Sequence, residues 1–200
     1  MTRRSGFTPY FPSGTVVIVA LGLFFVFGCD RSDESDLKMQ LRAEQGDPEA
    51  QTMLGLICER GDHARGILRN QKAAAAWYIR AANQDYPQAK VYLGVLYENG
   101  GGVGKDLAKA VDWYRNAAEQ EYPKAQIYLG EMYERGVGVQ QDYAEAYKWF
   151  HLAATQGWAE GVACQESLAH WMTPEQLVAA KRRIAAFTPR KSSTHSAVIH

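Results

Sequence analysis

The chain has 200 residues, a length that allows one domain of ordinary size. Its 22 lysines and arginines balance 22 aspartates and glutamates, so it lacks the basic excess of proteins that bind nucleic acid. Three cysteines are too few for a disulfide-stapled scaffold. Alanine, tyrosine and tryptophan are plentiful and β-branched residues are few, which favours helices over a sheet.

The first 28 residues predict a signal for export. Arg3 and Arg4 precede an uncharged apolar run, 15–28, which as a helix would extend about 21 Å and fall short of a hydrocarbon core of about 30 Å. A basic start followed by a short apolar run is typical of a secretory signal peptide. The alternative is that residues 1–28 stay in place as an N-terminal membrane anchor.

The apolar run ends in the sequence VFGC at 26–29, which resembles the lipobox of bacterial lipoproteins. The resemblance implies that Cys29 carries a diacylglycerol on its thiol and becomes the N-terminus after cleavage. Asp30 resembles the aspartate that retains enterobacterial lipoproteins in the inner membrane, so it favours that membrane. The charged residues over 29–36 predict a solvated tether. We therefore expect a membrane-anchored protein of the bacterial cell envelope that faces the periplasm.

One sequence pattern then occurs three times, in residues 48–85, 87–121 and 123–157. Each copy contains two helical patterns joined by a loop, and the loop is glycine-rich in the second and third copies. Each second helix is preceded by a residue suited to the N-cap, and these are Asn70, Asp106 and Asp142. A repeat of this length predicts an all-α architecture of stacked helix-turn-helix units.

Certain residue types recur at fixed positions in every copy. The first helices carry a glycine in their middle, at Gly55, Gly94 and Gly130. Because glycine costs about 1 kcal/mol relative to alanine inside a helix, we expect it to admit close approach by alanines of the second helix. A glutamate also recurs, at Glu59, Glu98 and Glu134, and we expect it to orient the loop backbone. The aromatic pairs of the second helices are expected in the core.

The pattern A-x-x-x-LG-x-x-YE-x-G-x-GV…D-x-x-x-A-x-x-WY-x-x-AA resembles the Sel-one-like repeat family, relatives of the tetratricopeptide repeats. The match is close over 87–121 and 123–157, whereas 48–85 has Cys58 in place of the tyrosine and GDHARGIL in place of the glycine-valine loop. The resemblance implies a right-handed α-solenoid that serves as a protein-binding scaffold. We expect this solenoid to span residues 37–187.

Both ends of the solenoid are expected to be capped. Residues 37–45 predict one leading helix, and 159–187 predict a partial capping repeat. Thr173 and Gln176 have the spacing of a capping box at the start of the final helix. The polar residues 188–200 predict a disordered tail.

The sequence carries no motif that favours catalysis, a metal or a cofactor, and we expect a protein that is not an enzyme. Residues 99–106, NGGGVGKD, resemble a phosphate-binding loop only superficially, because they lack its first glycine and its hydroxyl residue. His63, His151 and His170 have no cysteine or carboxylate at ligand spacing, so no metal site is expected.

The remaining candidate is a surface of the first helices, opposite Leu93, Leu96 and Tyr97. Adjacent first helices line the concave face of tetratricopeptide-like solenoids, so the resemblance implies a groove that suits a peptide or a partner helix. The alternative is a face that is simply solvated or covered by the tail. The predicted partner-binding residues are Thr52, Leu56, Arg60, Gln88, Val91, Val95, Asn99, Lys124, Ile127, Glu131 and Arg135.

We therefore expect a membrane-tethered interaction scaffold that binds a protein or peptide partner, without nucleic acid and without a small-molecule cofactor. One alternative is a cell-wall protein that binds peptidoglycan or penicillin with weak hydrolase activity, because some cysteine-rich Sel-one-like proteins are associated with weak penicillin binding. Those proteins carry paired cysteines in each repeat, which this chain lacks. A secreted factor that acts on a host is a further alternative.

Overall fold

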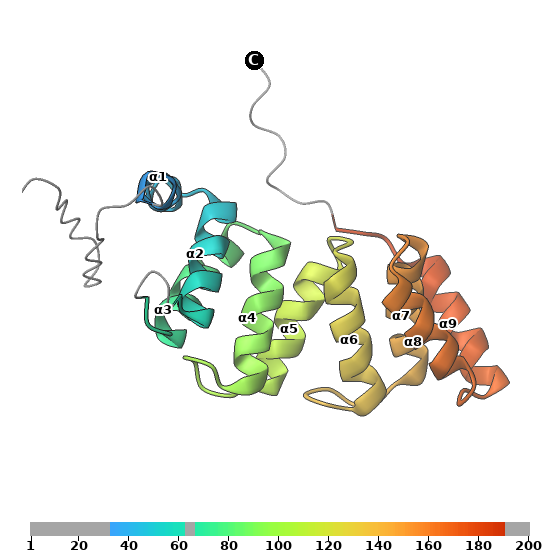
Figure 1. Cartoon of the computed structure of the whole chain (residues 1–200). Helices are drawn as coiled ribbons and strands as arrows, with labels where there is room; N and C mark the ends of the chain where they lie inside the picture. The colour runs from blue at the N-terminus through green and yellow to red at the C-terminus, as the bar shows by residue number, and fades with distance from the viewer. Residues whose placement is uncertain (1–32, 63–66, 191–200) are drawn as a thin grey trace, which may run out of the picture.

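The computed structural model describes residues 33–62 and 67–190, and within these ranges the chain is helical (Figure 1). The helices are α1 (Asp33–Glu44), α2 (Pro48–Arg60), α3 (Gln71–Asn83), α4 (Pro87–Asn99), α5 (Leu107–Ala118), α6 (Pro123–Arg135), α7 (Tyr143–Thr155), α8 (Ala159–Ala169) and α9 (Pro174–Ala186). In the described ranges no helix is long and apolar enough to cross a membrane. The predicted signal peptide or anchor, Cys29 and Asp30 lie outside the described residues.

The three copies of the repeat form helical hairpins, α2 with α3, α4 with α5, and α6 with α7. Figure 1 shows these hairpins side by side, with α1 at one end of an elongated molecule and α8 and α9 at the other. Each hairpin packs on the next through the second helix of one unit and the first helix of the following unit. The predicted all-α solenoid of helix-turn-helix repeats is confirmed.

The helix starts follow the predicted capping signals. The side chains of Asn70, Asp106 and Asp142 each accept a hydrogen bond of 3.0 Å from a backbone N–H in the first turn of the second helix. At α9, Thr173 and Gln176 form a reciprocal capping box. These caps satisfy backbone donors that the helix itself leaves unpaired.

The mid-helix glycines admit an aromatic ring, and the expectation of alanine neighbours was wrong. A Cβ on Gly94 would lie 2.5 Å from Cε1 of Tyr114, and a Cβ on Gly130 would lie 2.5 Å from Cε1 of Phe150. Both rings are fully buried. The glycine is therefore the space into which the large side chain of the second helix fits.

The recurrent glutamate binds that same ring, which also corrects a prediction. The Tyr78 hydroxyl donates a hydrogen bond of 2.8 Å to Glu59, and the Tyr114 hydroxyl donates one of 2.9 Å to Glu98. The glutamate thus satisfies a buried hydroxyl, as buried polar groups require, and does not orient the loop. Phe150 has no hydroxyl to donate in the third unit.

The glycine loops join consecutive units. A Cβ on Gly102 would lie 2.2 Å from the carbonyl oxygen of Gln71, and one on Gly138 would lie 2.4 Å from that of Leu107. Each loop therefore lies on the N-terminus of the preceding unit's second helix. Among the described residues, the unit formed by α2 and α3 is preceded by the single helix α1 and not by a helical hairpin.

The two ends depart from the predicted boundaries. Helix α1 begins at Asp33, inside the segment predicted as a tether. At the other end α9 packs mainly against α7 and not against its own partner α8, so 159–187 is not a repeat in the sense of the other three. Arg183 fixes this placement by donating hydrogen bonds of 2.8 Å to Asp142 and 3.2 Å to Glu145. Residues 188–190, predicted as the start of a disordered tail, are also held, since Arg190 binds the α5–α6 turn.

Candidate functional site

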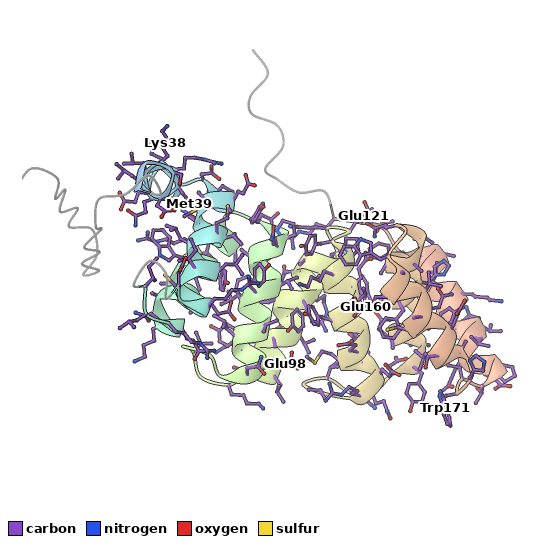
Figure 2. The ribbon with its side chains drawn as sticks, viewed as in Figure 1. Lys38, Met39, Glu98, Glu121, Glu160 and Trp171 are labelled. Atoms are coloured by element: carbon purple, nitrogen blue, oxygen red, sulfur yellow. The ribbon has the colours of Figure 1, made fainter. Side chains whose placement is uncertain are left out.

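The candidate site is the side of α2, α4, α6 and α8 that the second helices leave uncovered. These four first helices follow one another along the solenoid and contact each other in sequence. Figure 2 labels Glu98 at the lower end of α4 and Glu160 close to α6. We name this side the first-helix surface and define it by Gln88, Tyr92, Val95, Glu98, Lys124, Tyr128, Glu131 and Glu160.

Three of the predicted partner-binding residues are buried and cannot belong to this surface. Thr52, Val91 and Ile127 are 2%, 1% and 3% exposed. Val91 packs in a core with residues of α5 and α6, and Ile127 packs in a core with residues of α7 and α8. Each side chain thus fills the seam to the next unit, because neighbouring first helices close over that position. The Thr52 hydroxyl donates 2.7 Å to the Pro48 carbonyl within its own helix.

The other predicted residues remain accessible. Leu56, Gln88, Val95, Lys124 and Glu131 are half-buried, whereas Arg60, Asn99 and Arg135 are exposed at the C-terminal ends of α2, α4 and α6. Arg60, Asn99 and Arg135 thus give the surface polar ends. Its middle is less apolar than predicted, because two of the apolar residues assigned to it are in the core.

Two tyrosines that the sequence prediction missed lie at the centre of the first-helix surface. Tyr92 stacks on Tyr78 with ring centroids 5.2 Å apart, and Tyr128 stacks on Tyr114 at 5.1 Å. The ammonium group of Lys124 lies 5.7 Å from the Tyr92 ring centroid and 6.0 Å from that of Tyr128, within cation–π range. Tyr92 directly follows Val91, and Tyr128 directly follows Ile127. Moving the predicted surface positions by one residue along the helix would therefore have identified both tyrosines.

Carboxylates surround this aromatic pair. Glu131 is half-buried, and burial raises its pKa, with the negative charge of Glu160 adding to the effect and Arg135 opposing it. Glu98 and Glu134 raise the pKa of Glu131 further. Among the described residues none donates a hydrogen bond or forms an ion pair with the Glu131 side chain. A half-buried carboxylate that only the charge of Arg135 offsets would be stabilised further by a cationic ligand.

The described residues offer no reactive group at this surface. No group of three histidines, cysteines or carboxylates in the described part of the chain has the geometry to hold a metal ion. Burial raises the pKa of the Cys164 thiol, and the charges of Glu131, Glu160 and Glu134 add to this, so the thiol stays protonated at neutral pH. The arrangement is suited to binding.

Comparison with known proteins matches the Sel1 repeat to residues 48–86, 87–122 and 123–158, more than half of the chain. The chain belongs to the Sel1 repeat family. Proteins of this family are generally protein-interaction scaffolds and are generally not enzymes. Among curated proteins no sequence matches this chain.

Solved structures of other Sel1 repeat proteins are similar to this one. A Sel1 repeat protein from Oxalobacter formigenes is 31% identical, with a TM-score of 0.57 over 66% of this chain and 58% of its own. A protective antigen of uropathogenic Escherichia coli with an SLR fold is 25% identical, with a TM-score of 0.51 over 84% of this chain and 45% of its own. The chain thus spans about half the length of these two proteins.

The Helicobacter pylori cysteine-rich protein B shares the fold at 22% identity, with a TM-score of 0.51 over 64% of this chain and 95% of its own. In the present chain Cys58 and Cys164 are both free. They lie on α2 and α8, at opposite ends of the repeat array.

Proposed function

We propose that this Sel1 repeat protein is a membrane-tethered scaffold that binds a lysine- or arginine-bearing peptide segment of a partner along its first-helix surface. The observation that carries the proposal is the half-buried carboxylate of Glu131, which has no hydrogen bond or ion pair among the described residues and acts electrostatically on Tyr128. A basic side chain that enters this surface would neutralise Glu131. It could also lie over a tyrosine ring, as the ammonium group of Lys124 lies over the rings of Tyr92 and Tyr128.

The charge distribution supports a cationic partner. The whole chain has no net charge, yet the middle of the first-helix surface has three carboxylates, Glu98, Glu131 and Glu160, against the one ammonium group of Lys124, while Arg60 and Arg135 lie at its ends. Complementary charge at an interface speeds association and selects partners more than it adds raw affinity. We therefore expect selectivity for cationic over acidic segments and affinity that falls as salt is added.

The affinity of a fluorescent peptide for the full-length protein tests this function. A peptide that alternates lysine with leucine should bind, and the same peptide with glutamate in place of lysine should not. Replacing Glu131 and Glu160 by glutamine should weaken binding about tenfold, the effect of about 1.4 kcal/mol. Glu166→Gln, an exposed substitution on α8 outside the surface, is the matched control. Equal affinity for both peptides, or an unchanged affinity of the double variant, would reject the proposal.

Tethering is a separate part of the proposal and rests on the sequence of residues 1–30. The basic start, the apolar run and Cys29 support a lipoprotein held in the inner membrane with its repeats in the periplasm. Mass spectrometry of the N-terminal peptide from isolated membranes should find Cys29 at the N-terminus with the mass of a diacylglycerol added. An unmodified Cys29 preceded by residues 1–28 would show instead that the segment is an uncleaved anchor.

A further inference from the structure

After α9 the chain turns back along the molecule. In Figure 1 the segment that follows α9 runs toward the upper ends of α5 and α6, and Figure 2 labels Glu121 in the turn between these helices. The backbone N–H of Arg190 donates a hydrogen bond of 2.7 Å to the carbonyl oxygen of Glu119. Its guanidinium group donates 3.1 Å to Asn116 and 3.2 Å to Asp85. Arg190 therefore joins the α3–α4 and α5–α6 turns.

The other end of this segment is fixed in the core. The ring of Phe187 packs edge-on against Trp149 of α7, with ring centroids 5.4 Å apart and an interplanar angle of 76°. Phe187 is half-buried and contacts the hydrophobic cluster that contains Val111 and Tyr114. The ammonium group of Lys148 lies 5.9 Å from the Phe187 ring centroid. The segment is thus held by an apolar contact at one end and by polar contacts at the other.

The pairing of the carboxylate that receives Arg190 with a buried lysine is particular to one unit. Asp85 also accepts a hydrogen bond from Lys90, whose side chain is 3% exposed. Gln51 and Gln126 occupy the place of Lys90 in α2 and α6, and both are neutral amides. Burial alone would raise the pKa of Asp85, but the hydrogen bond and charge of Lys90, with Arg190 adding, hold it below its usual value. Asp85 therefore stays ionised at neutral pH and can hold both cations.

Units of a solenoid contact only their neighbours, so the array bends through small changes in packing between consecutive units. The segment 187–190 makes a contact of a different kind. Arg190 binds Asp85, which is 105 residues earlier in the sequence and belongs to a unit that is not its neighbour. We propose that residues 187–190 form a strap that fixes the spacing of consecutive turns and thereby the curvature of the first-helix surface. The consequence for binding rests on the proposed function; the restraint on the turns does not.

Amide hydrogen exchange of the full-length protein tests the strap. In a variant with Phe187→Ala and Arg190→Ala, amides of the α3–α4 and α5–α6 turns should exchange about tenfold faster. Arg190→Ala alone, which leaves Phe187 in the core, should give a smaller increase in the same turns. The strap does not reach α2, so amides of α2 are the internal control for general destabilisation. Lys181→Ala, on the exposed side of α9, is the matched control variant.

The outcomes separate the strap from the proposed function. Unchanged exchange in both turns, or an equal increase in α2, would overturn the strap. Faster exchange confined to the turns supports it, whether or not any peptide binds. If the lysine–leucine peptide binds the wild type, its affinity for the double variant should change at least about threefold. An unchanged peptide affinity with faster turn exchange would overturn the effect of the strap on the binding surface.

Discussion

At the scale of single residues, three residues of the second unit fit together in its core: Gly94, Glu98 and Tyr114. The missing side chain of Gly94 makes room for the Tyr114 ring, and Glu98 accepts the hydrogen bond of its hydroxyl. Tyr128 stacks on a face of that ring, with the ring centroids 5.1 Å apart. The Tyr114 ring is thus fixed by contacts at its edge, at its face and at its hydroxyl. This requirement for space explains why the glycine recurs although it lowers the stability of a helix.

Gly94→Ala should therefore destabilise the protein. The added Cβ would lie 2.5 Å from Cε1 of Tyr114, and the strain should exceed the gain in helix propensity of about 1 kcal/mol. We expect a net loss of about 1–2 kcal/mol in the free energy of unfolding, measured with urea. Gly104→Ala is the matched control, since nothing lies within 4 Å of its Cβ position. Equal stability of the two variants would show that the ring can move aside.

At the scale of helices, the sequence predicted where the elements lie but not which strip of the first helix is free. The starts of the second helices and of α9 follow from Asn70, Asp106, Asp142 and Thr173, because capping is a local interaction of a few residues. A first helix, in contrast, packs against its own second helix and against both neighbouring units. Most of its circumference is then buried. A prediction that assigns one half of the helix to the core and the other half to the surface therefore fails.

Val91 and Tyr92 show the consequence of that packing. The sequence prediction placed Val91 in the groove, but Val91 is buried against the next unit. The adjacent Tyr92 lies at the surface and stacks on Tyr78. The position of α9 was unpredictable for a related reason. Its placement on α7 depends on Arg183 meeting Asp142 and Glu145, residues about 40 positions earlier whose proximity no local pattern encodes.

At the scale of the whole molecule, the repeat array and its C-terminal segment have different roles. The stacked hairpins repeat the same core residues and so place the variable residues of α4, α6 and α8 side by side on one surface. The strap adds a connection between units that are not neighbours, through Phe187 and Arg190. The array thus creates the binding surface, and the strap restrains its shape.

Photo-cross-linking can locate where a cationic segment binds on the first-helix surface. The lysine–leucine peptide would carry a photoreactive group, and mass spectrometry would locate its cross-links on the full-length protein. We expect cross-links to α4, α6 and α8, centred on Tyr92, Tyr128 and Glu131. These cross-links should be lost in the double glutamine variant of Glu131 and Glu160. Cross-links concentrated on the second helices α3, α5 and α7, or on α9, would contradict this expectation.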